Sequence, residues 1–189
     1  MGKVVVTEFI SLDGVIEDPG GSEGTRHGGW TFAFDAGPEV PEFKLAELEA
    51  SDAQLLGRIT YDGFAKAWPT MEGTGEFGVK MNSMPKYVVS STLKNPTWEN
   101  TTVIGGDLAT EVGALRARYY GDVLVAGSAT LVRALLEHDL VDELHLMTFP
   151  VVLGAGKKLF GDAPDKKRFT VVDTKRLGDG VVLTQYGRG

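Results

Sequence analysis

The stretch from Asp122 to Phe160 constrains the fold more than any other, because it reads as strand, tight turn, helix and strand. Val123 to Ala126 is an unbroken apolar run, typical of a strand covered on both faces. Apolar residues then recur at helical spacing from Leu131 to Leu140, and Val141 to Val152 is again β-branched and apolar. The Gly127-Ser128 turn therefore starts a helix whose free N–H groups favour a phosphate, although a crossover without a ligand fits the pattern equally well.

The rest of the chain alternates in the same way. We expect strands at 3–9, 53–56, 86–90, 101–104, 168–176 and 181–186, and helices at 39–51, at 59–67 and after Asp107, which is a plausible helix cap. Residues 10–37 and 70–85 read as loops, and Gly178-Asp179-Gly180 is a strong hairpin signal. The pattern predicts one α/β domain over residues 1–189, with a largely parallel sheet, helices on both faces and a C-terminal antiparallel hairpin.

Composition limits the class of partner. A chain of 189 residues that is 42% hydrophobic suffices for one full core and is short for two domains. The formal net charge of −7 argues against nucleic acid or an anionic membrane as the main partner. The chain has no cysteine, and its three histidines show no metal-type spacing. We therefore expect a cytoplasmic protein that binds a small molecule and no metal, with no membrane span.

Two further motifs place possible phosphate ligands at the ends of predicted strands. In Gly57-Arg58-Ile59-Thr60, a guanidinium and helix amides can grip a phosphate, although Arg58 is equally explained as a solvated helix-start residue. Ser90 to Thr92 end another strand, where hydroxyls bind phosphate or ribose or, more commonly, serve a turn. Ligands of open α/β sheets bind outside the carboxyl ends of the strands, so one phosphate-bearing ligand would span these clusters and Gly127-Ser128.

Two glycine-rich segments match nucleotide motifs by letter only. Gly73 to Gly78 matches the dinucleotide fingerprint, but it does not follow an apolar strand, and Glu72 and Glu76 would repel a pyrophosphate. Gly154 to Lys158 is similar to the end of a phosphate-binding loop, yet Val151 replaces its first glycine and a lysine replaces its Ser or Thr. We expect neither segment to bind a nucleotide.

Three acids near the expected site are candidate proton donors. Asp13 lies in Ser11-Leu12-Asp13-Gly14, and Asp35 and Glu39 follow Gly28-Gly29-Trp30. Proton donation would require partial burial that raises the pKa of the carboxyl group. For each acid taken alone, a role in a turn or at a helix start is the commoner use.

Six segments, in order and over nearly the whole chain, resemble the dihydrofolate reductase-like superfamily. Within it, the chain is similar to stand-alone proteins that resemble the reductase domain at the C-terminal end of bacterial bifunctional riboflavin-biosynthesis enzymes. The segments are Ser11–Ile16, Gly28–Trp30, Leu55–Tyr61, Tyr87–Leu93, Val125–Leu131 and Leu153–Phe160. The resemblance implies a mixed, mostly parallel sheet of about eight strands, NADPH as hydride donor and, often, a homodimer.

The resemblance also assigns site residues. It implies that Gly57 to Thr60, with the hydroxyls of Ser90 to Thr92, hold the adenosine end of NADPH and its 2′-phosphate. It also implies that Gly127 to Leu131 lie under the pyrophosphate and that Phe9 and Ile16 face the nicotinamide. The helix acid of dihydrofolate reductases aligns with Asp35 or Glu39. The cofactor-binding set is Phe9, Ile16, Gly57, Arg58, Thr60, Ser90, Ser91, Thr92, Gly127, Ser128, Ala129, Thr130 and Leu131.

The implied function is an NADPH-dependent reductase that transfers hydride to a small heterocyclic acceptor, similar to a pterin, a pyrimidine or a flavin precursor. Two alternatives stay open: a true dihydrofolate or pterin reductase, and a non-catalytic protein that binds NADPH. Val15 stands where riboflavin reductases commonly carry Lys or Arg, so the acceptor is less clearly inherited than the cofactor. The valine-rich C-terminal hairpin either forms an interface or closes the sheet.

Overall fold

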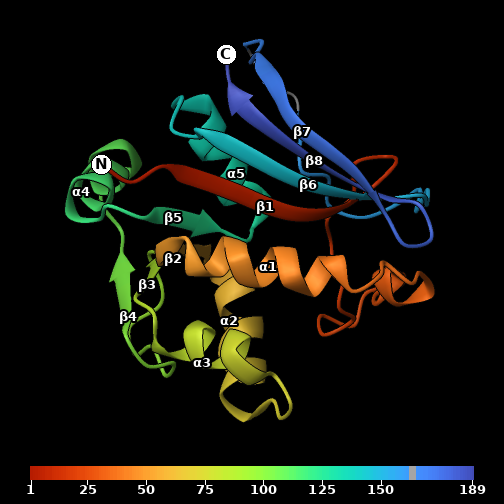
Figure 1. The fold of residues 1–189 in the computed structure, drawn as a ribbon. Helices are drawn as coiled ribbons and strands as arrows, with labels where there is room; N and C mark the ends of the chain where they lie inside the picture. Colours follow the sequence, from red (N-terminus) through yellow and green to blue (C-terminus); the bar gives the residue numbers. More distant parts are fainter. Residues whose placement is uncertain (162–164) are drawn as a thin grey trace.

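The computed structural model describes residues 1–161 and 165–189, and its centre is one eight-stranded sheet (Figure 1). The strands lie in the order β4-β3-β2-β5-β1-β6-β8-β7. Their bounds are β1 Val4–Ser11, β2 Ser51–Gly57, β3 Lys86–Val89, β4 Thr101–Ile104, β5 Asp122–Val125, β6 Glu143–Phe149, β7 Phe169–Leu177 and β8 Val181–Arg188.

The first six strands pair in parallel, and β8 and β7 add an antiparallel hairpin at one edge. The hairpin turns at Gly178 to Gly180, as the sequence predicts. The pairing of β1 with β5 covers Val4 to Val6, whereas β1 continues beside β6 as far as Ser11. The predicted mixed, mostly parallel sheet with a C-terminal antiparallel hairpin is therefore confirmed, and the two central strands β1 and β5 part beyond Val6.

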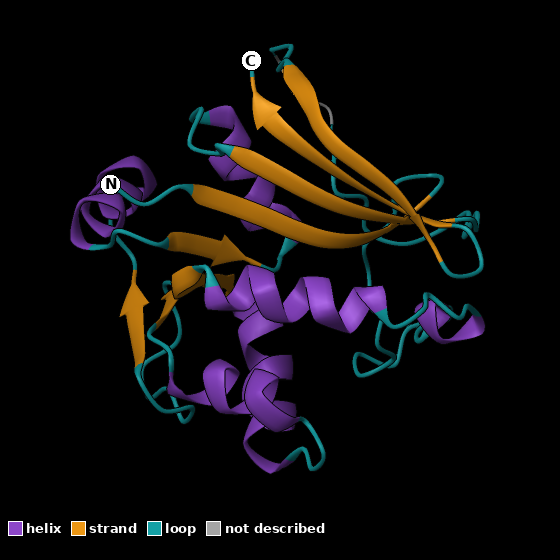
Figure 2. Cartoon of the chain, viewed as in Figure 1, coloured by secondary structure: helices purple, strands orange, loops and turns teal. Residues whose placement is uncertain are grey.

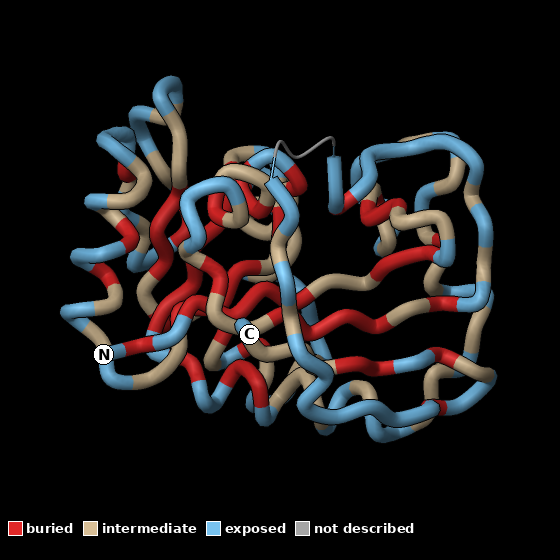
Figure 3. The backbone as a smooth tube through the Cα atoms, turned by 90° about the horizontal axis from the view of Figure 1, so that it is seen from above, coloured by how far each residue is buried: buried red, intermediate tan, exposed pale blue. Residues whose placement is uncertain are grey.

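Helices cover both faces of the sheet (Figure 2). They are α1 Glu39–Glu49, α2 Arg58–Ala67, α3 Gly75–Ser83, α4 Leu108–Arg118 and α5 Ala129–Glu137, with short 3-10 helices η1 Trp30–Ala33 and η2 Trp68–Thr70. Leu48, Tyr61 and Met81 of α1 to α3 pack against one face of the sheet. Val112 of α4 and Leu135 of α5 belong to the cluster on the other face. Figure 3 shows buried residues concentrated along the strands and exposed ones in the outer loops.

The prediction of a loop over residues 70–85 is wrong, because α3 occupies Gly75–Ser83. Glycine is a poor helix former, and the two glycines of this segment hide the signal. Packing decides the outcome: Met81 is buried, and Gly78 lies so close to Thr74 that a Cβ would meet its hydroxyl. The letter match to a dinucleotide fingerprint is therefore largely a helix packed against α1 and η2.

The long loop after β1 is ordered by side-chain contacts, although η1 is its one short helical segment among the described residues. Asp18 accepts hydrogen bonds from the backbone N–H groups of Glu23 and Thr25 at 2.9 and 3.0 Å. The indole of Trp30 donates to the carbonyl of Glu17 at 2.9 Å. These bonds fold the loop back toward β1, so that it can form a wall of a cavity.

Candidate active site

A cavity of about 460 Å³ opens where β1 and β5 part. Its walls come from β1, the loop after β1, α1, α2 and the start of α5. This volume lies within the range of small-molecule sites, which are commonly found at the carboxyl ends of parallel strands. Seven residues predicted from the sequence line it: Phe9, Ile16, Thr60, Gly127, Ser128, Ala129 and Thr130.

Two glycines meet at one corner of the cavity, where Gly127 lines the wall and Gly57 lies behind it. Gly57 donates from its backbone N–H to the carbonyl of Gly127 at 3.2 Å. A Cβ at Gly57 would lie 2.2 Å from the hydroxyl oxygen of Ser128, so no larger residue fits there without displacing the turn. Gly127 has φ +86°, and a Cβ on it would lie 2.8 Å from Oγ1 of Thr60. Close backbone approach thus explains both glycines, and it leaves the start of α5 open to a ligand.

A basic and hydroxyl-rich group lies beside this corner, at the ends of β2 and β3. Arg58 Nη1 donates to the hydroxyl of Thr92 at 3.4 Å, and its Nε donates to both carboxylate oxygens of Asp62 at 2.9 and 2.8 Å. Ser90 Oγ accepts from the backbone N–H groups of Thr92 and Leu93 at 3.2 and 3.0 Å. The structure therefore brings Arg58, Ser90 and Thr92 together, with the Arg58 side chain 38% exposed and able to meet a ligand.

The remaining predicted cofactor residues lie outside the cavity wall. Ser91 is exposed next to the Ser90 turn, and Gly57 supports the turn from beneath. Leu131 is 5% exposed and packs in the core cluster of α4 and α5, so its side chain serves packing.

The three predicted acids lie away from the cavity wall. Asp13 accepts hydrogen bonds from the Ser11 hydroxyl at 2.7 Å and from the N–H groups of Leu153 and Gly154 at 3.1 and 2.8 Å. These bonds lower the pKa of Asp13 to about 2, which suits a loop anchor and not a proton donor. Asp35 and Glu39 are exposed, and Asp35 bonds through its backbone to the hairpin residue Asp179.

The inner wall of the cavity holds a buried polar group that the sequence reasoning missed. Lys44 Nζ on α1 donates to Thr7 Oγ1 at 2.6 Å and to Glu47 Oε2 at 2.5 Å. Glu47 Oε1 in turn lies 2.6 Å from Nδ1 of His145 on β6. Glu8 lines the cavity beside this group, and its Oε1 atom is buried without a hydrogen-bond partner among the described residues.

The pKa values of the buried Glu47 and the half-buried Glu8 are shifted in opposite directions. Burial favours the neutral form of Glu47, but Lys44 and His145 outweigh it and keep its pKa below the ordinary value. At Glu8, burial has the largest effect on the pKa and raises it. The charge of Lys44 lowers this pKa and the charge of Glu47 raises it, and the net result is a pKa of about 8. One signal in the sequence pointed to Glu8: it interrupts the apolar strand VVVTEFI with an acid.

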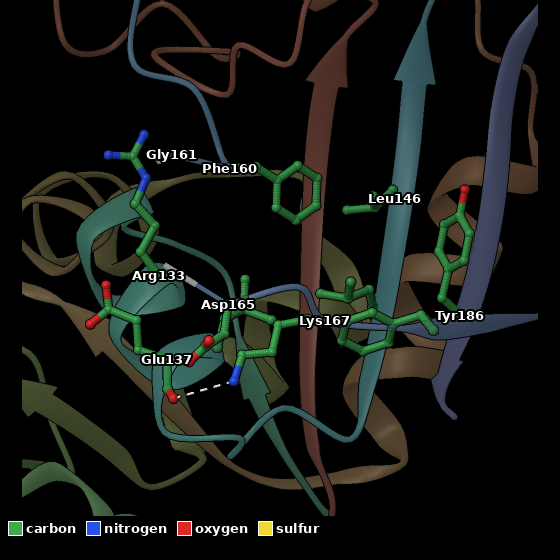
Figure 4. Close-up of a pocket in the computed structure, with 11 residues that line it drawn as sticks. Arg133, Glu137, Leu146, Phe160, Gly161, Asp165, Lys167 and Tyr186 are labelled. Atoms are coloured by element: carbon green, nitrogen blue, oxygen red, sulfur yellow. Dashed lines mark hydrogen bonds between the residues drawn. The ribbon is translucent and has the colours of Figure 1, made fainter. Parts of the chain in front are cut away.

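A second hollow, of about 600 Å³, lies over α5, β6 and β8 (Figure 4). Both of its basic residues are engaged within the chain: Arg133 Nε donates to the carbonyl of Leu159 at 3.2 Å, and Lys167 Nζ donates to Asp139 at 3.0 Å. Its other walls include Leu146, Phe160 and Tyr186. None of the site residues predicted from the sequence lines it, so the cavity between β1 and β5 is the candidate active site.

In residues 1–161 and 165–189, no cluster of three or more His, Asp or Glu side chains is arranged to hold a metal ion. Nor does that part of the chain contain a helix with the length and apolarity of a membrane span.

Comparison with known proteins relates this geometry to a family. Residues 2–183 match the family described as the RibD C-terminal domain. The chain is 29% identical over 187 residues to the uncharacterized protein YyaP of Bacillus subtilis (strain 168), covering 97% of this chain and 94% of YyaP.

Two solved structures share the fold. A putative riboflavin biosynthesis protein from Shewanella sp. PV-4 has a TM-score of 0.80 at 25% identity, covering 100% of this chain and 99% of that one. A dihydrofolate reductase from Enterococcus faecalis, complexed with NADP(H) and RAB-propyl, has a TM-score of 0.59 at 17% identity, covering 100% and 97%. With a match from residue 2 to residue 183, this chain belongs to the RibD C-terminal domain family, a family of reductase domains with the dihydrofolate reductase-like fold.

Proposed function

We propose that the protein is an NADPH-dependent reductase that acts on a small heterocyclic acceptor. The observation that carries the proposal is that Arg58 and Thr92 lie together next to the Gly57–Gly127 contact, and that Gly127 of this contact lines the cavity. A guanidinium with neighbouring hydroxyls suits a phosphate monoester, and the start of α5 beneath a glycine suits a pyrophosphate. The family adds support, because the E. faecalis reductase of the same fold is complexed with NADP(H).

In this proposal, each part of the site binds one part of the cofactor. Arg58, Ser90, Ser91 and Thr92 hold the 2′-phosphate end, with Gly57 and Thr60 beside it. Gly127, Ser128, Ala129, Thr130 and the backbone of Leu131 face the pyrophosphate. Phe9 and Ile16 line the inner cavity, where the nicotinamide would lie, and exclude water from it. Bound NADPH supplies a hydride, and the chain's own part is to orient the acceptor against it.

The inner cavity supports a heterocyclic acceptor. Its wall combines the aromatic and aliphatic side chains of Phe9, Ile16 and Leu124 with the polar groups of Glu8 and Lys44. Such a wall suits a flat ring that carries nitrogen or oxygen atoms at its edge. A homodimer and a cytoplasmic location stay predictions.

Thermal unfolding with NADPH, with NADH and without ligand tests the proposal first. A ligand at about 100 times its Kd should add about 2.7 kcal/mol of stability. We expect a shift with NADPH and little shift with NADH, because NADH has no 2′-phosphate for Arg58. No shift with either cofactor would refute the reductase proposal.

Acceptors are then sought by following NADPH oxidation. Dihydrofolate and a simpler pterin represent the pterin class of acceptor, and a ribosylaminopyrimidine phosphate represents the pyrimidines and flavin precursors. Turnover of dihydrofolate that an antifolate inhibits would identify a true dihydrofolate reductase. Cofactor binding without turnover of any acceptor would indicate a binding protein instead.

A further inference from the structure

Glu8 is the residue of the cavity wall that cofactor binding leaves unexplained. It lies on the same face of β1 as Val6, just beyond the last residue that β1 pairs with β5. Its Oε1 atom is buried and, within the described part of the chain, unpartnered. Buried polar atoms in proteins nearly always have a hydrogen-bond partner, so an exception in a cavity wall indicates a ligand.

The groups around Glu8 leave it free to act on a ligand. Lys44 and Glu47 on α1 are the charges that act on the pKa of Glu8, and they bind each other at 2.5 Å. A Cβ on Gly127 would lie 3.6 Å from Oε1 of Glu8, so this carboxyl group lies beside the turn before α5. The other charged residues that line the cavity come from the loops: Glu17, Asp18, Glu23 and Lys157.

We propose that Glu8 is the proton donor of the reductase, a role that rests on the function proposed above. The acceptor carbon of a C=N or C=O bond takes the hydride from NADPH, and the pair of electrons in that π bond shifts to the nitrogen or oxygen. The O–H bond of the Glu8 carboxyl group breaks, and a new N–H or O–H bond forms on the acceptor. The products are the reduced acceptor, NADP⁺ and a Glu8 carboxylate, which regains its proton from water.

The surroundings of Glu8 fit both states of this cycle. Burial holds the neutral acid before the reaction, since its pKa of about 8 lies above neutral pH. A neutral acid beside Gly127 also avoids repulsion of a bound pyrophosphate. After proton transfer, the ammonium group of Lys44 stabilises the carboxylate, because it is the one charge near Glu8 that lowers the pKa.

Three other acids of this region are already engaged, whereas Glu23 lines the cavity from the loop and burial raises its pKa as well. Asp18 accepts hydrogen bonds from Glu23 and Thr25, and Asp13 accepts three. Both have pKa values below the ordinary range and hold no proton at neutral pH. Glu47 is ionised by its contacts with Lys44 and His145. Of the two glutamates in the inner wall, only Glu8 has a pKa high enough to keep a proton at neutral pH and donate it.

The protonation of Glu8 is tested on the protein without substrate, by carbon NMR titration of the glutamate carboxyl groups. We expect one resonance that titrates near pH 8 in the wild type and is lost in Glu8→Gln. Glu49→Gln is the matched control, because it makes the same change at an exposed position of α1, outside the cavity wall. Titration of every glutamate at its ordinary pKa would overturn the proposal.

Turnover with an accepted substrate tests the role itself. General acid catalysis contributes about 10²- to 10⁴-fold, so Glu8→Gln should lower kcat by about 100-fold or more while NADPH still binds. The wild-type rate should fall above about pH 8 as Glu8 loses its proton, and Glu8→Asp should recover part of the rate. Unchanged kcat in Glu8→Gln, or a loss confined to NADPH affinity, would overturn the proposal.

The two proposals fail in different ways. If wild-type protein does not bind NADPH or turns over no acceptor, the reductase function fails and the donor role falls with it. If wild type is active and Glu8→Gln keeps its pH profile, only the donor role fails.

Discussion

The phosphate end and the acid end of the candidate site are built in different ways. The phosphate end, made of Gly57, Arg58, Ser90, Thr92 and Gly127, is partly exposed and uses glycines and residues at strand ends. The acid end, made of Glu8, Lys44, Glu47 and His145, is largely buried and joins β1, α1 and β6. The first end is suited to hold a charged ligand from water, and the second to keep a proton in place. Affinity and chemistry should therefore respond to different substitutions.

The largest expected effect comes from the acid end and concerns stability against pH. Glu8 has a pKa of about 8 in the folded chain and 4.5 as its ordinary value. Between these values the folded state holds a proton that the unfolded state has released, so the free energy of unfolding falls as pH rises from 4.5 to about 8. Glu8→Gln removes this effect.

Urea denaturation of wild type and Glu8→Gln across this pH range measures it. We expect the two stability curves to diverge by several kcal/mol, with the variant relatively more stable at the alkaline end. Glu49→Gln should run parallel to the wild type, because Glu49 is exposed. Parallel curves for Glu8→Gln would show that its carboxyl group is not buried in the neutral form.

Lys44→Met gives the next largest effect. The substitution keeps the aliphatic stem and removes the ammonium group that contacts Glu47, whose side chain is only 2% exposed. Removing one partner of a buried pair lowers the free energy of unfolding by about 3–5 kcal/mol. Because Glu47 keeps its contact with His145, we expect a loss at the lower end of this range, about 3 kcal/mol. Lys66→Met, at an exposed position of α2, should change the free energy of unfolding by less than about 0.5 kcal/mol. If Lys44→Met lowers the free energy of unfolding no more than Lys66→Met does, the contact between Lys44 and Glu47 contributes no more than an exposed pair.

Much of the fold follows from the sequence because its signals are local. The apolar run at Val123, the hairpin glycines around Asp179 and the cap at Asp107, which accepts from the N–H of Thr110 at 2.9 Å, each act within a few residues. The helix α3 did not follow, because Gly75 and Gly78 oppose it and packing of Met81 overrides them.

The same distinction explains which part of the site could be predicted. The phosphate end lies in short motifs, each readable within four residues, and the strand order brings them together. The acid end depends on contacts such as that between Glu47 and His145, which are 98 residues apart. In the helix EVPEFKLAELE, Glu47 is one of several charged residues, and only the tertiary structure shows that it is buried.

Arg58→Ala probes the phosphate end and should leave the acid end intact. Loss of a charge-assisted contact to the 2′-phosphate should weaken NADPH binding by about 10- to 100-fold, or about 1.4–2.8 kcal/mol. NADH binding should hardly change, and the free energy of unfolding should fall by less than about 1 kcal/mol, since the Arg58–Asp62 pair is exposed. Titration of both cofactors by fluorescence measures the ratio. Equal weakening of NADPH and NADH would exclude a role at the 2′-phosphate.

Asp62→Asn gives the smallest effect and decides how Arg58 is held. Both carboxylate oxygens of Asp62 accept from Nε of Arg58, so Asp62 either orients the guanidinium or competes with the phosphate for it. We expect competition to dominate, because a carboxylate beside the 2′-phosphate also repels it. NADPH binding should then tighten about two- to threefold, while stability falls by about 0.3–0.5 kcal/mol through loss of the i,i+4 pair. Weaker NADPH binding in Asp62→Asn would instead show that Asp62 orients Arg58. Combining Asp62→Asn with Arg58→Ala separates the two contributions: tightening that persists without Arg58 reports direct repulsion, and tightening that disappears reports release of the guanidinium.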